Sequence, residues 1–300
     1  MNENKAFKEK KGAFVITIGV ILAIYALTFI LLFFWGVSTS LKSRSDFYTN
    51  KVWLPKGMPW EWEWKNYPYV FANFHLILMD DIGNKLKFTI DFQITYTLIY
   101  AFGSAFLRAF VPCIIAYVTQ KWDNLCSKLI YTAVIITMIV PIVGSSASLM
   151  VIMKQLRLYD TFLGVFIMQA SFTGFYYLMY YGVFKGLAKE YSEAATIDGA
   201  NEYRVLFSIM LPLIKSTFAT VFLIMFIAAW NDYQTPLLWL PMHPTLAYGV
   251  FEMSRSTENG LSSTPMRLTC CMITALPVLA LFIAFRNQIM GNLTMGGVKE

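Results

Sequence analysis

The sequence has few charged residues. Asp, Glu, Lys and Arg make up 14% of its 300 residues, whereas hydrophobic residues make up 57%. A soluble domain carries roughly a quarter of its residues as charged side chains. The composition therefore excludes an ordinary soluble enzyme and indicates a polytopic membrane protein. The net charge of +6 is spread over many loops, with no basic helix or aromatic RNA-binding pattern, so we expect no nucleic-acid partner.

The sequence also lacks the patterns of metal, nucleotide and hydrolytic sites. Its two histidines, His75 and His243, are isolated, and its four cysteines have neither CxxC nor metal-ligand spacing. It contains no GxxxxGK[ST], H-E-x-x-H or G-x-S-x-G motif. We therefore expect no catalytic site, no metal and no cofactor bound by this chain. Energy for its function must come from another protein.

What the sequence has instead is a series of long apolar runs, each near the ~20 residues that cross a bilayer. These runs are residues 13–37, 94–118, 129–152, 161–184, 217–240 and 268–285. The predicted fold class is all-α: a polytopic membrane protein with six transmembrane helices. We expect residues 1–300 to form a single transmembrane domain.

Charge near the first run predicts the orientation. Lys5, Lys8, Lys10 and Lys11 precede it, and positive charge stays on the cytoplasmic side of a membrane. The run is too long for the apolar part of a removable signal peptide, so we expect it to remain as a span. An even number of spans then places the N- and C-termini in the cytoplasm. Residues 186–212, the loop between the fourth and fifth runs, lie on the same side. The expected location is the cell membrane.

Residues 190–212 form the longest polar, helix-compatible stretch between apolar runs. One face of its first part shares a helical spacing and is mostly small and apolar. The residues on this face are Leu187, Tyr191, Ala194, Ala195 and Asp198. Gly199 should end the helix, because glycine takes the left-handed conformation without a Cβ penalty. A second short helix fits residues 200–210, so the stretch predicts two short helices joined at a glycine elbow.

This stretch resembles the EAA loop of binding-protein-dependent ABC importers. The resemblance rests on Glu193-Ala194-Ala195, on Gly199, and on Ile209-Met210-Leu211-Pro212 nine residues further on. In that family the loop is cytoplasmic and docks into a cleft of the ATP-hydrolysing subunit. The docking residues that the resemblance implies are Glu190, Glu193, Ala194, Ala195, Asp198 and Gly199. The residues around them are most similar to the carbohydrate branch, specifically a maltose-permease-like second subunit.

Polar residues inside two other runs need an explanation. Arg108 lies near the middle of its run, where an arginine costs about 2.5–3.5 kcal/mol on insertion scales. We expect it to face the protein or a wet cavity and to have a carboxylate or carbonyl partner. Trp230, Asn231 and Asp232 precede Pro236-Leu237 in a run that is again similar to carbohydrate permeases. We predict that Arg108, Trp230, Asn231 and Asp232 line or brace a translocation path. Contact with the substrate and an interhelical hydrogen-bond brace both stay open as roles.

The resemblance implies a transmembrane permease subunit of an ATP-driven importer for a sugar or oligosaccharide. It also implies a complex with a second homologous permease subunit, two ABC ATPase subunits that use ATP-Mg, and an extracellular substrate-binding protein, all assembled at the lipid bilayer. Two alternatives stay open. An importer of a non-carbohydrate solute would share the loop, and a membrane-embedded enzyme would need clustered ionisable groups, whereas Asp91, Arg108 and Asp232 are scattered in the sequence.

Overall fold

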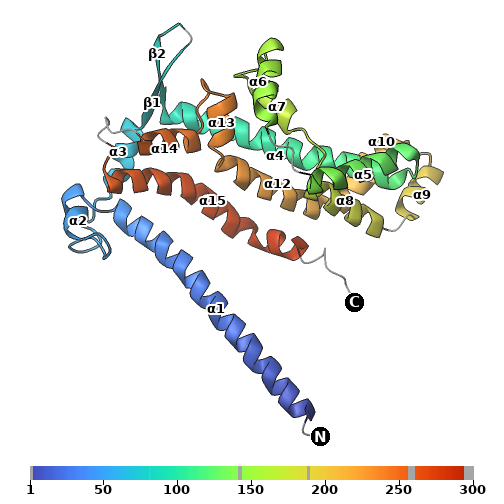
Figure 1. Cartoon of the computed structure of the whole chain (residues 1–300), viewed down its shortest axis with the longest axis horizontal. Helices are drawn as coiled ribbons and strands as arrows, with labels where there is room; N and C mark the ends of the chain where they lie inside the picture. The colour runs from blue at the N-terminus through green and yellow to red at the C-terminus, as the bar shows by residue number, and fades with distance from the viewer. Residues whose placement is uncertain (1–2, 81, 141–143, 188–189, 256–260, 294–300) are drawn as a thin grey trace. The chain divides into compact units, whose positions relative to one another are not determined.

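The computed structural model describes residues 3–80, 82–140, 144–187, 190–255 and 261–293 (Figure 1). The chain forms two compact units. One contains the chain up to Phe74 together with Met253–Ala275, and the other contains His75–Glu252 and the chain from Leu276 onward. The described residues are mostly helical, with one two-stranded sheet, so the chain has the predicted helical membrane fold class with a small β-hairpin added.

The first unit is built on a long helix whose C-terminal end is held by buried polar groups. Its helices are α1 (Glu3–Ser40), α2 (Arg44–Thr49), α3 (Asn66–Asn73) and the first part of α15 (Thr264–Leu293). The buried Asn66 amide donates to the carbonyls of Ser40 at 2.8 Å and Lys42 at 3.1 Å, and the Thr269 hydroxyl donates to Ser40 at 3.1 Å. These bonds satisfy carbonyls that the end of α1 leaves free.

The second unit begins with a β-hairpin that sequence reasoning did not predict. Strands β1 (His75–Met79) and β2 (Lys85–Thr89) are antiparallel, with His75 opposite Thr89. The Asp80 carboxylate closes the turn by accepting the backbone N–H groups of Asn84 at 2.7 Å and Ile82 at 3.0 Å. Hydrogen bonds from the Asn84 side chain and backbone lower the pKa of Asp80. The carboxylate therefore organises the turn instead of standing only as a solvated charge.

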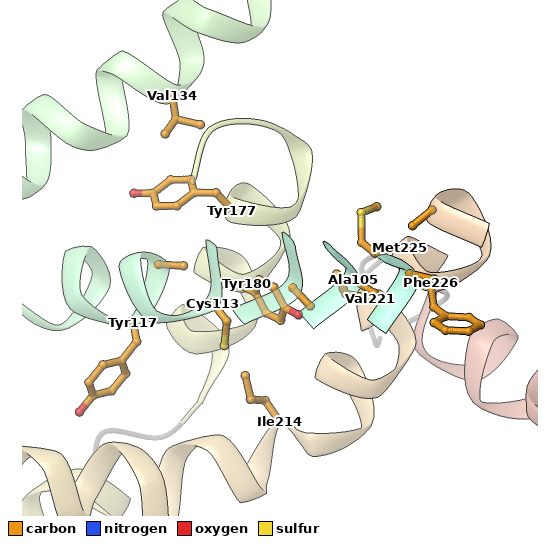
Figure 2. Packing of buried hydrophobic residues seen from close by; sticks show 14 of the residues in the cluster. Ala105, Cys113, Tyr117, Val134, Tyr177, Tyr180, Ile214, Val221, Met225 and Phe226 are labelled. Atoms are coloured by element: carbon orange, nitrogen blue, oxygen red, sulfur yellow. The ribbon is translucent and has the colours of Figure 1, made fainter. Parts of the chain in front are cut away.

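Helix α4 (Ile90–Lys121) is the spine of the second unit. Its small residues at intervals of four or three are fully buried: Ala101, Ala105, Ala109, Cys113 and Ala116. Small side chains let membrane helices approach closely, and this drives packing where lipid provides no hydrophobic effect between helices. Helices α8 (Phe175–Gly186) and α12 (Lys215–Trp230) pack against α4 along its length. Figure 2 shows this core, with Cys113 of α4 close to Tyr180 of α8.

Among the described residues, fewer helices are long enough to cross a membrane unbroken than the six apolar runs of the sequence. Within the described residues, three helices are long and apolar enough to cross a membrane: Phe14–Ser40, Ile90–Lys121 and Thr264–Asn287. A fourth crossing results if the pair Glu202–Leu213 and Lys215–Trp230, bent by 76°, is taken as one span. The predicted first, second and sixth runs therefore correspond to helices of spanning length.

The predicted third and fourth runs are each divided between two shorter helices. Residues 129–152 fall on α5 (Leu125–Ile139) and α6 (Ser145–Gln155), and residues 161–184 fall on α7 (Phe162–Gln169) and α8. Gly144 at φ +87° and Gly174 at φ +114° precede α6 and α8. This backbone conformation is open to glycine and interrupts a helix. Neither run is a single transmembrane helix.

The predicted fifth run also has an earlier helix end. Helix α12 ends at Trp230, and α13 (Gln234–Trp239) follows after Asn231 and Asp232. The polar pair therefore lies at a break between two helices and not inside one helix.

Asp160 joins the loop before α7 to the loop before α14 (Leu246–Arg255). Its carboxylate accepts the Met242 N–H at 3.1 Å and lies 3.1 Å from Nδ1 of His243, while its own N–H donates to Trp239 at 3.1 Å. His243 also packs edge-on against Tyr96, with ring centroids 5.2 Å apart. The expectation that His243 is isolated is therefore wrong in three dimensions.

Gly164 gives a direct test of close packing at the start of α7. A Cβ at this position would overlap the backbone carbonyl oxygen of Leu158, which cannot move as a flexible side chain does. Overpacking of this kind costs roughly 1–3 kcal/mol. We expect Gly164→Ala to lower the midpoint temperature of thermal unfolding of the detergent-purified protein.

Gly182→Ala is the matched control, because no atom lies within 4 Å of a Cβ built there and the site is helical. Alanine inside a helix is favoured over glycine by roughly 0.5–1 kcal/mol, so this variant should melt at the same temperature as the parent or higher. Equal midpoints for Gly164→Ala and the parent would contradict the packing that the structure shows.

Candidate functional site

The predicted site residues lie at two places in the second unit. One is the segment from α9 (Glu190–Ile197) through α10 (Glu202–Val205) to α11 (Leu211–Leu213), which we call the elbow segment. The other is where α4, α7, α12 and α13 meet, and it contains Arg108, Trp230, Asn231 and Asp232.

The elbow segment has the turn that the sequence predicts. Helix α9 closes with N–H bonds from Asp198 to Ala194 at 3.0 Å and from Ala200 to Ala195 at 2.9 Å. Gly199 lies between them at φ +80° with open space around it. It is the backbone conformation, and not crowding, that calls for glycine here, because a side chain with this φ costs roughly 1–2 kcal/mol.

The second helix of the elbow segment is longer than predicted. The Asn201 side chain caps it by accepting the Arg204 N–H at 2.9 Å, and the helical path runs through a π-helical turn, η1 (Leu206–Met210), to Leu213. Val205, Leu206 and Met210 are buried in the core of the second unit. The elbow segment is therefore anchored on one side by its second helix.

The first helix presents its other side to solvent. Ala195 is buried, whereas Glu193, Ala194 and Asp198 are exposed. Large apolar side chains are also exposed along the segment: Tyr191 at 52%, Ile197 at 86%, Tyr203 at 76% and Phe207 at 51%. No ion pair of Asp198 is found in the described part of the chain. The Glu190 side chain lies outside the described part.

An ion pair connects the elbow segment to the spine. Nζ of Lys121, the last residue of α4, pairs with the Glu202 carboxylate and donates to the Tyr117 hydroxyl at 3.2 Å. A cavity of about 650 Å³ lies beside this pair, between the end of α4 and α9. Sequence reasoning missed the pair because its residues are 81 positions apart and neither stands out locally.

Asp232 is held by hydrogen bonds from two other helices. The fully buried Tyr100 of α4 donates its hydroxyl to Oδ2 of Asp232 at 2.8 Å, and the Thr235 N–H donates to Oδ1 at 3.1 Å. The Gln169 amide of α7 donates to the Tyr100 hydroxyl at 3.0 Å. This chain of donors satisfies a carboxylate in an apolar setting, and it is an interhelical brace.

The other two residues of the predicted group have different roles. Trp230 is buried and packs against Phe226 with ring centroids 5.8 Å apart. Asn231 is exposed, and its side chain donates to the Ile227 carbonyl of its own helix at 2.9 Å. Within the described residues, the hydrogen bond to another helix is therefore made by Asp232 and not by Asn231.

Arg108 lines a cavity of about 420 Å³ between α4, the α7–α8 connection, α12 and α13. Half-buried on α4, it faces Tyr176 and the hydroxyl-bearing connection at Ser171 and Thr173 across this cavity. Arg108 therefore faces a cavity within the second unit. The expected carboxylate or carbonyl partner is not found among the described residues, which supply no hydrogen bond or ion pair to this guanidinium.

Two relatives cover nearly the whole chain. The melibiose/raffinose/stachyose import permease MelC of Bacillus subtilis is 26% identical over 284 residues, which are 94% of this chain and 96% of that protein. The probable starch degradation products transport system permease AmyC of Thermoanaerobacterium thermosulfurigenes is 25% identical over 286 residues, 94% of this chain and 95% of that protein.

A solved structure has the same fold. The crystal structure of a bacterial ABC transporter involved in the import of the acidic polysaccharide alginate contains a chain with a TM-score of 0.73 and 21% identity. The match covers 91% of this chain and 95% of that chain. At this identity the likeness is one of fold.

Residues 109–294 match the family described as the inner membrane component of binding-protein-dependent transport systems. The match contains the elbow segment and Asp232, and its members are transport permeases that are not themselves catalytic. This chain belongs to that family of membrane-embedded permease components.

Proposed function

We propose that this chain is the transmembrane permease subunit of an ATP-driven ABC importer that translocates a sugar or an oligosaccharide across the cell membrane. The observation that carries the proposal is the elbow segment, a projecting helix that ends at Gly199 and is anchored by a buried second helix. Relatives described as permeases for melibiose, arabinooligosaccharides and starch degradation products support a carbohydrate.

The energy source in this proposal lies outside the chain. Two ABC ATPase subunits bind and hydrolyse ATP-Mg, and this chain holds no cofactor of its own. A second homologous permease subunit completes the membrane part, and an extracellular substrate-binding protein delivers the sugar. Both termini and the elbow segment lie in the cytoplasm, which is the side where ATP is available.

The elbow segment suits docking into a partner cleft. Tyr191 and Ile197 offer exposed apolar area, and such area is usually buried in an interface. Glu190 and Glu193 are acidic residues that can form ion pairs with basic residues of an ATPase. The small Ala194 allows a partner surface to approach the helix closely.

Movement of the docked helix has two routes into the membrane part. One is the Lys121–Glu202 pair, which joins the elbow segment to the end of α4. The other is the helical path through Leu213 and the 76° bend into α12. Both α4 and the α12–α13 break carry the Tyr100–Asp232 brace, so closure of the ATPase pair is expected to shift the helices around the translocation path together.

Purification from native membranes tests the proposal as a whole. A tagged copy of this chain should bring down an ATPase and a second permease, and the reconstituted complex should accumulate a labelled oligosaccharide only with ATP and binding protein. Accumulation of a non-carbohydrate solute in its place would overturn the carbohydrate assignment. Absence of any ATPase from the purified material would overturn the importer itself.

The elbow segment generates a prediction about attachment of the ATPase. Gly199→Val forces a β-branched residue into a left-handed conformation, and Glu193→Lys reverses an exposed charge. We expect each variant to reach the membrane in normal amounts but to retain at least about threefold less ATPase on purification, since about 0.7 kcal/mol of lost binding has this effect. Uptake should fall in parallel.

Gly182→Val is the control, because it places the same side chain at an uncrowded glycine without positive φ. It should retain ATPase at the parental level. Normal ATPase retention together with normal uptake in both elbow variants would show that this segment does not couple the two subunits.

The link between Lys121 and Glu202 generates a separate prediction about transmission. Reversing one charge, as in Lys121→Glu or Glu202→Lys, replaces attraction with repulsion, while a partly exposed pair contributes about 0.2–1 kcal/mol. We expect either single variant to retain ATPase and to lose uptake several-fold. The double variant Lys121→Glu, Glu202→Lys should recover most of the uptake.

The double variant is the decisive measurement. Recovery shows that the two side chains act through each other across the junction of α4 and the elbow segment. If the double variant transports as poorly as the worse single variant, the pair is a surface contact without a role in transmission.

A further inference from the structure

The guanidinium of Arg108 is a feature of the second unit that the brace and the elbow segment leave unexplained. An arginine always carries its charge, and a charge in a membrane span is retained only with a counter-charge, dipoles or water. The described residues offer it no hydrogen bond or ion pair, and the cavity it faces has no Asp or Glu among its described lining. Arg108 is therefore the charged side chain of that described lining.

The walls of this cavity, which we call the Arg108 cavity, suit a sugar ring. Its volume of about 420 Å³ lies within the range of small-molecule sites. Tyr176 and Trp239 offer aromatic faces, while Ser171 and Thr173 form a hydroxyl pair 2.8 Å apart on the irregular connection before α8. Polar groups for hydroxyls and flat apolar faces for C–H groups are thus present on the same walls.

Gln169 also lines the Arg108 cavity, beside the brace. Its amide nitrogen donates to the Tyr100 hydroxyl at 3.0 Å, so this side chain links the cavity wall to the brace.

We propose that the Arg108 cavity recognises a carboxylate-bearing sugar, with Arg108 binding the carboxylate and the Ser171 and Thr173 hydroxyls meeting hydroxyl groups of the same molecule. The inference rests on the proposed function, because it names the substrate class of the same importer. A planar guanidinium binds a planar carboxylate through two parallel hydrogen bonds. A single cation matches one carboxylate, whereas a phosphate monoester carries a charge of about −1.5 to −2 and calls for more than one.

The position of the cavity also connects recognition to the helix contacts. Gln169 and Thr235 belong to the cavity wall and also to the hydrogen bonds around Tyr100 and Asp232. A substrate in the cavity therefore lies against side chains that hold α4, α7 and α13 together.

The experiment uses the purified complete complex and three labelled probes: a uronic acid disaccharide, its neutral parent disaccharide, and a disaccharide monophosphate. Equilibrium binding is measured without binding protein, and uptake is measured with it. Variants are Arg108→Gln and Arg108→Lys, with Arg157→Gln as the control, since Arg157 is an exposed arginine on the α6–α7 connection.

We expect the parent complex and Arg157→Gln to bind the uronic acid disaccharide at least tenfold more tightly than the neutral one. Arg108→Gln should remove that preference and leave neutral binding unchanged, because only the charge contact is lost. Arg108→Lys should keep the charge but lose the two-bond geometry, and so give an intermediate preference.

Other outcomes overturn the proposal in distinguishable ways. Preference of the parent for the monophosphate would assign the cavity to phosphate. Equal binding of acidic and neutral sugars by the parent, with a loss of complex assembly in Arg108→Gln, would make Arg108 a partner of a carboxylate on the second permease. Uptake of neither sugar and no ATPase in the purified complex would instead refute the proposed function.

Discussion

Close approach of helices to the small face of α4 is the constraint on which the second unit depends. Ala101, Ala105, Ala109 and Cys113 are completely buried, so α8 and α12 reach within side-chain contact of the α4 backbone. In lipid this packing must come from dispersion and hydrogen bonds, because burying apolar surface gains little there. A larger residue on this face would separate the helices and lengthen every polar link that crosses them.

Those polar links are placed along the same helix. Tyr100 reaches Asp232, the Thr119 hydroxyl lies 2.7 Å from the Tyr177 hydroxyl, and Lys121 reaches Glu202 at the end of α4. Each link needs the short helix separation that the small residues allow. One continuous helix therefore carries the contact to the elbow segment at one end and the brace beside the Arg108 cavity further along. The two sites are thus joined by a single element of the fold.

Local features of this fold were predictable from sequence, and long-range ones were not. The turn at Gly199 could be predicted because the ability to take a positive φ is a property of a single residue. A carboxylate in an apolar run predicts that Asp232 has a hydrogen-bond partner. The sequence does not identify that partner, because Tyr100 lies 132 positions away and belongs to no recognisable motif. The four-residue spacing of alanines on α4 was a readable signal of the packing face. The helix breaks within residues 129–152 and 161–184 could not be predicted from hydropathy, because a single glycine hardly changes the mean hydropathy of a long apolar run.

The break before Gly174 explains why a cavity can exist at all in this part of the membrane. Irregular backbone at membrane depth is tolerated where it is buried in protein or lines a water-filled space. The connection from Gln169 to Gly174 lines the Arg108 cavity, and the Ser171 and Thr173 hydroxyls, which lie 2.8 Å apart, belong to its wall. A continuous helix over residues 161–184 would satisfy its own backbone hydrogen bonds and leave Arg108 without this polar wall. The interruption, which hydropathy does not reveal, is thus the feature that places polar groups around Arg108 between apolar helices.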